Sequence, residues 1–323
     1  MRRLIVVRDT TVARLTDRKL STQLKSYRLA FHTFSRESSE IEVLNLSRIA
    51  KNSKAELIIG VGGGKCLDTS KLAAWKLGLP LITVPTSAAT CSAWTGVAPV
   101  YGEDGGYRHT IEGPSPHGLI LDNELTATAP PRFLASGMVD ALAKYYEPRD
   151  NMTSVPTGIG QTALQLGEGI YETISRYGPL AYRAAGKGRN SEALNCVAHT
   201  SIVQTGLVGE LGGKVFRHGL AHSLYGAWTF LGLTRRYLHG ELVGLGLLIE
   251  LNLAGKRREH RMLHAWMKSW NMPTALPDFA RYQNSKSELK ALCVHMAKFS
   301  QMVPLTKAFL KDPLKAMKIV SSK

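Results

Sequence analysis

The sequence has few cysteines and no long apolar run, and each shortage excludes a class of protein. Its four cysteines, Cys66, Cys91, Cys196 and Cys293, lie far apart and form no Cys-x-x-Cys pair. This spacing argues against a disulfide framework and a cysteine-based structural zinc site, and it indicates reduced thiols. No apolar stretch approaches the roughly 18 residues that a membrane span needs. We therefore expect a cytoplasmic protein with no membrane partner.

Acidic residues are also scarce. The chain has 41 Lys and Arg against 25 Asp and Glu, which gives a formal net charge of +16. A basic surface attracts nucleic acids and small anions alike. Here the basic residues are spread along the chain without an aromatic-interleaved stripe, and no nucleic-acid-binding motif is present. We expect a small-molecule substrate and no nucleic-acid partner.

At 323 residues and 44% hydrophobic composition, the chain is long enough for two packed cores. Its first part alternates between two kinds of pattern. Strand-like runs at residues 4–7, 56–61 and 80–86 alternate with helix-like stretches at 39–53 and 65–78. This alternation predicts right-handed βαβ units and a parallel sheet.

The character of the sequence changes at the double proline Pro130–Pro131. Before it lie a glycine-rich, hairpin-like segment at 100–110 and a further strand candidate at 118–125. After it, periodic helical patterns cover residues 134–147, 159–178, 191–209, 219–232 and 242–255. We predict an α/β, Rossmann-like domain over residues 1–130 and an all-helical domain over 131–323.

Three glycines, Gly62, Gly63 and Gly64, separate the second strand from the helix that follows. Without Cβ atoms, their N–H groups can converge on a ligand, and the helix N-terminus behind them favours negative charge. A dinucleotide pyrophosphate suits this place. The turn matches neither of the usual nucleotide fingerprints, and a glycine run also serves simply to turn a chain.

Five motifs occur in order along most of the chain: GVGGGKCLDTSK, VPTSAATCSAWT, GMVDALAKYYE, AHSLYGAW and YLHGELVGLG. Together they resemble the iron-containing (type III) alcohol dehydrogenase family, in its branch of glycerol dehydrogenases and hydroxycarboxylate dehydrogenases. The resemblance implies a dehydroquinate synthase-like fold, a metal-dependent oxidoreductase that transfers hydride to or from NAD, and a closed homo-oligomer. It also implies that the first domain lacks the family's usual N-terminal strand and helix.

The same resemblance implies the residues that contact the cofactor. They are Asp9, Gly63, Gly64, Lys65, Asp68, Thr86, Thr95, Val97 and Tyr101. A carboxylate at Asp9 would accept a hydrogen bond from a ribose 2′-hydroxyl and repel a 2′-phosphate, which favours NAD over NADP. Arg8 beside it acts in the opposite sense, so NADP stays an alternative, and an Asp after a strand is also a common turn residue.

The resemblance further implies a metal site at Asp140, His222 and His239. Two imidazoles and one carboxylate with an open fourth position form a catalytic zinc site, where the metal acts as a Lewis acid on the substrate oxygen. His218 is an alternative ligand, because its i, i+4 spacing from His222 would place both on one helical face. Iron-dependent members carry a histidine four residues after the aspartate. Here that residue is Lys144, which favours zinc over iron.

The substrate is indicated by a departure from the family pattern. Glycerol dehydrogenases carry an aspartate in the loop after VPT, and this sequence has Cys91 there. The change removes a hydroxyl acceptor and a charge that would repel an anion, so we expect Cys91 to face a small 2-hydroxy or 2-oxo acid. Three alternatives remain: a glycerol or polyol dehydrogenase, a dehydroquinate synthase-like lyase, and a non-catalytic member with a degenerate site. Cys91 could also be a packing residue only.

Overall fold

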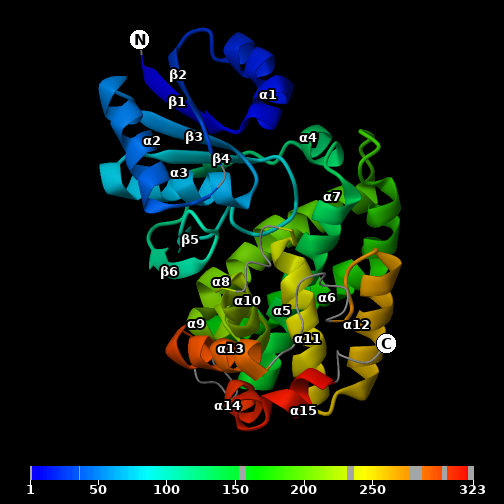
Figure 1. Cartoon of the computed structure of the whole chain (residues 1–323). Coiled ribbons are helices and arrows are strands. Elements are labelled where there is room, and N and C mark those ends of the chain that lie inside the picture. Colours follow the sequence, from blue (N-terminus) through cyan, green and yellow to red (C-terminus); the bar gives the residue numbers. More distant parts are fainter. Residues whose placement is uncertain are drawn as a thin grey trace.

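The computed structural model describes residues 2–35, 37–152, 158–230, 236–275, 286–299 and 304–318. An α/β part built from about the first two fifths of the chain lies against a larger helical part (Figure 1). The described helices are all too short or too polar to cross a membrane.

A five-stranded sheet forms the centre of the α/β part. All its paired strands are parallel, and their order is β2-β1-β3-β4-β7. The strands are β1 (Arg3–Arg8), β2 (Arg28–Thr33), β3 (Leu57–Gly62), β4 (Leu81–Pro85) and β7 (Gly118–Leu119). This arrangement confirms the predicted parallel sheet.

The sheet is buried on both faces. Successive side chains of a strand point to opposite sides, so the two sets of side chains pack in different apolar clusters. In β1, Ile5 and Val7 belong to one apolar cluster, and Leu4 and Val6 belong to another. The helices of this part are α1 (Thr10–Gln23), α2 (Glu40–Asn52), α3 (Gly64–Leu77) and the short α4 (Asn123–Ala127). Strands covered on both faces read as continuous apolar runs, which is why β1 and β3 were recognisable in the sequence.

The chain order creates a crevice at the carboxyl ends of two central strands of this sheet. From β1 the chain moves outward to β2, and it then returns across β1 to form β3 on the other side. Such a reversal opens a crevice beyond the carboxyl ends of the two strands. Asp9 follows β1 and the three glycines lie at the end of β3, so both flank this crevice.

Two predicted features differ in the structure. Neither α1 nor β2 was identified in the sequence. The strand β2 lies at the edge of the sheet and has a half-exposed, mixed pattern with no clear apolar alternation. The strand expected at 118–125 is only two residues long. The side chain of Asp122 accepts hydrogen bonds from the backbone N–H groups of Glu124 and Leu125, and this cap starts α4 instead of extending the strand.

The hairpin expected near residues 100–110 is present. Strands β5 (Val97–Tyr101) and β6 (Tyr107–Glu112) pair antiparallel and form a separate two-stranded sheet. The hairpin reaches the helical part, since the backbone N–H of Tyr107 donates to the hydroxyl of Thr229.

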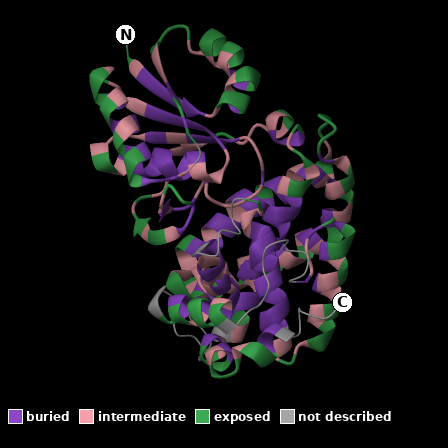
Figure 2. Cartoon of the chain, viewed as in Figure 1, coloured by how far each residue is buried: buried purple, intermediate pink, exposed green. Residues whose placement is uncertain are grey.

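The helical part is arranged around two buried helices, α5 (Pro131–Asn151) and α11 (His239–Leu253), which pack on each other (Figure 2). The other helices are α6 (Ile159–Ala184), α7 (Glu192–His199), α8 (Thr205–Gly212), α9 (Lys214–Arg217), α10 (Leu220–Phe230), α12 (Arg257–Ser269), α13 (Lys286–Phe299), α14 (Pro304–Lys311) and α15 (Pro313–Lys318). In α11, every residue from Gly240 to Leu251 is buried, and all of these residues except Glu241 and Glu250 are apolar, as in a helix that is covered on all sides.

One expected helix is interrupted. Residues 191–209 form α7 and α8, joined by a π-helical turn over Thr200–Gln204. The hydroxyl of Thr205, directly after this turn, donates to the carbonyl of Thr200. No residue type in this stretch marks the wider turn, and for this reason the sequence did not reveal it.

Helix α5 begins at Pro131, next to the predicted boundary, with proline at the first helical position where its missing N–H costs nothing. The apolar core of the helical part also includes Leu67, Ala88, Ala93 and Ala127 from before the boundary. The two parts therefore share packed surface, and the division into two domains at residue 130 stays a prediction.

Candidate active site

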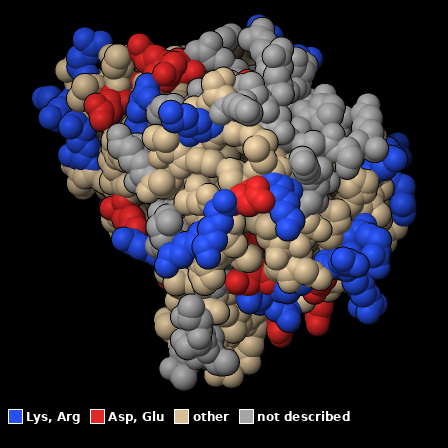
Figure 3. Space-filling view, turned by 60° about the horizontal axis from the view of Figure 1, so that its bottom comes forward, with Lys and Arg blue, Asp and Glu red and all other residues tan. Residues whose placement is uncertain are grey.

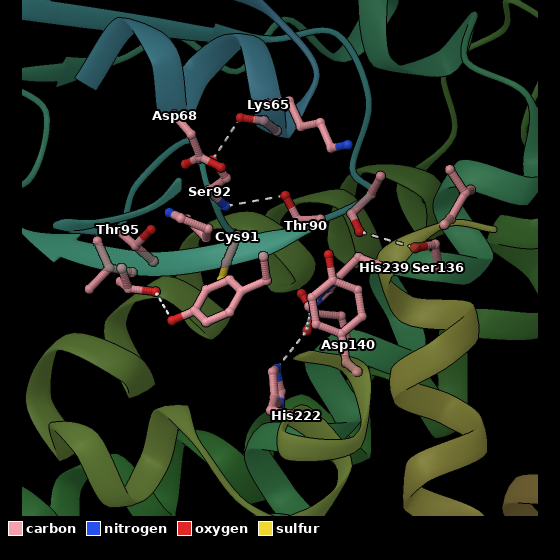
Figure 4. A pocket seen from close by; sticks show the side chains of 18 of the residues that line it. Lys65, Asp68, Thr90, Cys91, Ser92, Thr95, Ser136, Asp140, His222 and His239 are labelled. Carbon is pink, nitrogen blue, oxygen red and sulfur yellow. Dashed lines mark hydrogen bonds and ion pairs between the residues drawn. The ribbon is translucent and has the colours of Figure 1, made fainter. Parts of the chain in front are cut away.

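Asp140, His222 and His239 come together from three different helices (Figure 4). The Nε2 atom of His239 lies 3.1 Å from Oδ1 of Asp140, and the Nε2 atom of His222 lies 3.4 Å from the same oxygen. One ligand atom from each residue lies within 4.8 Å of the others. This spacing fits a single divalent ion bound by two nitrogens and one oxygen.

Close backbone contacts fix the helices that carry these ligands. The N–H of Gly240 donates to the hydroxyl of Ser136 at 3.0 Å, and a Cβ atom on Gly240 would lie 1.9 Å from the Ser136 carbonyl oxygen. A Cβ atom on Gly137 would lie 1.7 Å from the carbonyl oxygen of Ala88. Glycine at both positions thus lets α11 approach α5, and lets α5 approach the loop after β4.

The sequence analysis did not identify Glu147, although this residue orients a ligand. Its Oε2 atom lies 2.5 Å from Nδ1 of His222, and its Oε1 atom accepts a hydrogen bond from the backbone N–H of His222 at 3.0 Å. Glu147 is fully buried. A carboxylate on one imidazole nitrogen leaves the other nitrogen for a metal and raises its basicity. The signal in the sequence was the seven-residue spacing from Asp140, which places both on one face of α5.

The site favours a charged carboxylate. Burial alone would raise the pKa of Asp140, but the imidazoles of His239 and His222 and the ammonium of Lys144 outweigh it and hold that pKa well below its usual range. Burial also opposes the charged form of His222, yet Glu147 and Asp140 raise the pKa of its imidazole overall. Asp140 is therefore ionised and ready to bind a cation.

The structure does not support the expected geometry of His218. Helix α10 begins only at Leu220, and His218 caps α9 in an extended conformation, so it does not share a helical face with His222. It lines the same pocket, and burial lowers the pKa of its imidazole to about 4. The prediction that both histidines lie on one helix is wrong, because the chain turns at Gly219.

The glycine turn leads into α3 without a side-chain cap. Gly63 is the N-cap residue, and no side chain accepts a hydrogen bond there. A Cβ atom on Gly63 would meet nothing within 4 Å, whereas one on Gly62 would lie 2.9 Å from Cβ of Cys66. The turn is therefore tight on one side and open on the other. The first N–H groups of the helix have no partner within the helix, so they can bind an anion.

Other predicted cofactor residues already have partners in the protein. Asp68 accepts from the hydroxyl of Ser92 at 2.6 Å and pairs with the fully buried Lys71 at 2.8 Å. Lys65 pairs with Glu37 at 2.5 Å, and its ammonium lies 4.9 Å from the centre of the Tyr101 ring. Such contacts preorganise the glycine turn and the β5 hairpin beside it.

Asp9 and Thr86 flank the glycine turn in different ways. Asp9 is the N-cap of α1 and accepts from the N–H of Val12 at 2.8 Å, while also lining the pocket. The N–H of Thr86 donates to the carbonyl of Gly62 at 3.1 Å. Thr86 thus holds the turn but is not part of the pocket wall, in contrast to the other predicted cofactor residues.

A single cavity of about 510 Å³ connects these groups. Lys65 and Asp68 lie on the side of α3, and the three candidate metal ligands lie across the pocket, with Cys91 between (Figure 4). The residues predicted from the sequence that line it are Asp9, Gly63, Gly64, Lys65, Asp68, Cys91, Thr95, Val97, Tyr101, Asp140, His222 and His239. The arrangement can hold an extended anionic ligand and a metal ion side by side.

Cys91 lines this pocket and does not carry a charge. Burial raises the pKa of its thiol to about 12, and Asp140 acts in the same direction. A thiol with such a pKa is a poor nucleophile, which leaves Cys91 as a small neutral wall residue.

Comparison with known proteins agrees with this architecture. A model of the iron-containing alcohol dehydrogenase family matches residues 1–130. A glycerol dehydrogenase of Thermotoga maritima is 31% identical, with the match covering 86% of this chain and 77% of that protein. Hydroxycarboxylate dehydrogenase A of Escherichia coli is 29% identical over 80% of this chain and 72% of its own length. The solved structure of a glycerol dehydrogenase from Schizosaccharomyces pombe superposes with a TM-score of 0.84 at 24% identity, over 99% of this chain and 83% of that one.

The fold and these matches define an oxidoreductase with a parallel-sheet part and a helical part. The chain belongs to the iron-containing alcohol dehydrogenase family, whose members are metal-dependent, NAD-linked dehydrogenases. The resemblance and the fold class expected from the sequence are thereby confirmed. The relatives favour an oxidoreductase over the alternative of a lyase.

Proposed function

We propose that this protein interconverts a small 2-hydroxy acid or alcohol and its carbonyl compound, with hydride transfer to or from a nicotinamide cofactor. The observation that supports this most is the common pocket. Its walls carry both an uncapped helix N-terminus behind three glycines and a cluster of two imidazoles and a carboxylate. Hydride transfer needs a cofactor and a substrate held in close contact, and both groups of residues line the same pocket.

Each residue has a defined task in this proposal. Asp140, His222 and His239 would hold a divalent ion, which supplies Lewis acidity at the substrate oxygen. Glu147 keeps His222 in the tautomer whose Nε2 faces the site. The N–H groups at the start of α3 bind the pyrophosphate of the cofactor. The Asp68–Lys71 pair fixes the wall beside it, since the Lys71 ammonium also donates to the backbone carbonyls of Thr95 and Val97.

The donor set supports zinc. Two imidazoles, one carboxylate and an open position are the ligands of many catalytic zinc sites. Among the described residues, these three are the ones grouped tightly enough to share an ion, and the residue one turn after Asp140 is Lys144, which carries no lone pair for a metal when charged. We propose zinc rather than iron, to be tested by metal analysis and by reconstitution of the metal-free protein with each ion.

Cofactor choice depends on Asp9. Because its side chain lines the pocket beyond β1, we propose that it favours NAD over NADP. An Asp9→Ser variant tests this cleanly, since serine is an equally good N-cap for α1 and only the charge is lost. We expect weaker discrimination against NADP in kcat/KM. Equal discrimination in both proteins would assign Asp9 to capping alone.

A 2-hydroxy or 2-oxo acid is the proposed substrate class, and glycerol or another polyol is the second candidate. The neutral Cys91 presents no charge that would repel an anion. The relatives include both a hydroxycarboxylate dehydrogenase and glycerol dehydrogenases, so both classes need testing.

The experiment is a screen of the zinc-loaded protein with NAD and NADP against 2-hydroxy acids, 2-oxo acids, glycerol and diols, with absorbance of the reduced cofactor as the signal. His222→Ala and His239→Ala should abolish turnover and lower bound zinc. Full activity of a zinc-free double variant would overturn the metal role. Binding of NADH without turnover of any substrate would favour the non-catalytic alternative.

Three broader expectations also remain proposals. They are a homo-oligomer, a cytoplasmic location and a domain boundary at residue 130. Light scattering coupled to size exclusion tests the first, fractionation tests the second and limited proteolysis tests the third. Among the described residues on the face shown in Figure 3, the Lys and Arg side chains lie in several separate groups, with acidic residues between some of them. This supports the expectation that nucleic acid is not a partner.

A further inference from the structure

Lys144 is a buried cation in the wall of the pocket. It follows Asp140 by one turn of α5, so both side chains lie on the same face of the helix. Its relative exposure is 5%, and it lines the same cavity as Asp140, His222 and Cys91. A charge in this position lies beside the place where the substrate would bind.

The ammonium of Lys144 makes no hydrogen bond or ion pair within the part of the chain that the structure describes. Other buried cations of the site differ in this respect. Lys71, for example, contacts Asp68, Thr95 and Val97. Burying a charge without a partner is costly, so a protein retains one where a ligand supplies the partner.

The charges around Lys144 identify the missing partner. Asp140 precedes it by four residues and Glu147 follows it by three on α5, which places both carboxylates on its side of the helix, and Cys91 lines the same pocket. His218 on the same wall stays neutral because burial lowers the pKa of its imidazole. A divalent ion on the candidate ligands would be balanced by the carboxylates of Asp140 and Glu147. The charge of Lys144 is then left without compensation, and an anionic ligand restores the balance.

We propose that Lys144 binds the carboxylate of the substrate and so selects 2-hydroxy and 2-oxo acids over neutral alcohols and polyols. The inference rests on the proposed dehydrogenase function and names the residue that decides its substrate class. A carboxylate of such an acid is separated from the reacting oxygen by one carbon–carbon bond. The one-turn spacing of Lys144 from Asp140 gives the two ends of the acid adjacent anchors, the ammonium for the carboxylate and the ligand cluster for the oxygen.

The principal variant is Lys144→Met, which keeps an unbranched side chain one atom shorter and removes its charge. The readout is the ratio of kcat/KM for pyruvate to kcat/KM for hydroxyacetone, two compounds that differ at the carboxylate. A charge-assisted hydrogen bond of this kind corresponds to about a 10- to 100-fold change, so we expect the ratio to fall by that factor. Lys144→Arg, which keeps the charge, should retain most of the preference for the acid.

Binding gives a second readout that does not depend on turnover. Calorimetry with oxamate, an unreactive analogue of a 2-oxo acid, on the zinc-loaded protein with NADH should show a similar loss in Lys144→Met. Lys76→Met, on the exposed side of α3, is the matched control and should bind oxamate like the parent protein. Zinc content measured on every variant separates loss of the substrate anchor from loss of the metal.

The outcomes separate this inference from the proposed function. If the parent protein reduces no carbonyl compound, the proposed function fails. If it turns over substrates but Lys144→Met leaves both the ratio and the oxamate affinity unchanged, Lys144 is not the anchor. Another outcome is that Lys144→Met loses zinc, whereas Lys144→Arg keeps zinc and, like the parent protein, prefers hydroxyacetone to pyruvate. Lys144 then has a structural role, and the inference is overturned. Lys144→Gln serves in the same comparison if the Met variant does not fold.

Discussion

At the residue scale, the site depends on a buried carboxylate that is not itself a ligand. Glu147→Gln keeps the shape of the side chain but removes its charge next to Nδ1 of His222. Because this carboxylate orients the imidazole and raises its basicity, we expect zinc affinity to fall about 10- to 100-fold. A competition titration with a chromogenic chelator measures the change. Glu168→Gln, an exposed position on α6, is the control. Unaltered affinity would reduce Glu147 to a packing role.

The residues of this site were predictable to different degrees. Asp140, His222 and His239 were inferred from a resemblance, and the structure brings them together. Glu147 was missed because its partner His222 is 75 positions away in the chain, and a contact at this separation follows only from the packing of α10 on α5. His218 was misplaced because spacing alone does not show where a helix begins.

At the scale of single elements, a buried, hydrogen-bonded pair of side chains ties α2 to β2. Glu42 contacts Nε2 of His32 at 2.9 Å and accepts from the hydroxyl of Ser35 at 2.8 Å. Burial would raise the pKa of Glu42, but these hydrogen bonds lower it overall. A carboxyl whose pKa is lower in the folded state stabilises the protein above its unfolded pKa of about 4.3 and loses that contribution as the pH falls below it.

Glu42→Gln should therefore destabilise the protein by about 1–3 kcal/mol at pH 7, where the carboxylate is charged. The difference from the parent protein should shrink as the pH falls below about 4 and through the lowered pKa of Glu42, because the carboxyl group of the parent protein then becomes neutral like the amide of the variant. Urea unfolding at a series of pH values measures it. A difference that does not depend on pH would mean that the charge of Glu42 contributes nothing.

Helix α11 requires glycine at its second position. A methyl group on Gly240 would collide with the backbone of Ser136, so Gly240→Ala must push α11 away from α5 and displace His239. Overpacking of this kind costs about 1–3 kcal/mol, and we expect a lower Tm together with weaker zinc binding. Gly169→Ala on α6 is the matched control, because nothing lies within 4 Å of its Cβ position. It should keep or raise Tm, since alanine is the better helix former. Wild-type zinc affinity in Gly240→Ala would show that α11 can shift without moving its ligand.

At the scale of the whole molecule, the order of many helices and strands could be predicted from the sequence, but the contacts between them could not. Continuous apolar runs revealed β1, β3 and β4, and periodic patterns revealed α5, α6 and α11. Pairing order, the crevice between β1 and β3, and the shared core of the two parts depend on contacts between distant segments. The edge strand β2 and the π-helical turn left no clear pattern. These features decide where the pocket lies, so the sequence could suggest its residues but not its shape.

The assembled site makes a prediction about the stability of the whole chain. Its three candidate ligands join α5, α10 and α11, and an ion bound to all three holds the centre of the helical part together. A ligand that binds only the folded state at 100 times its dissociation constant raises the free energy of unfolding by about 2.7 kcal/mol. We therefore expect zinc to raise Tm measurably in the parent protein and not in His239→Ala. His109→Ala, an exposed histidine on β6, should respond like the parent protein. An equal rise in His239→Ala would place the ion elsewhere, since only a site that contains His239 loses the effect with that side chain.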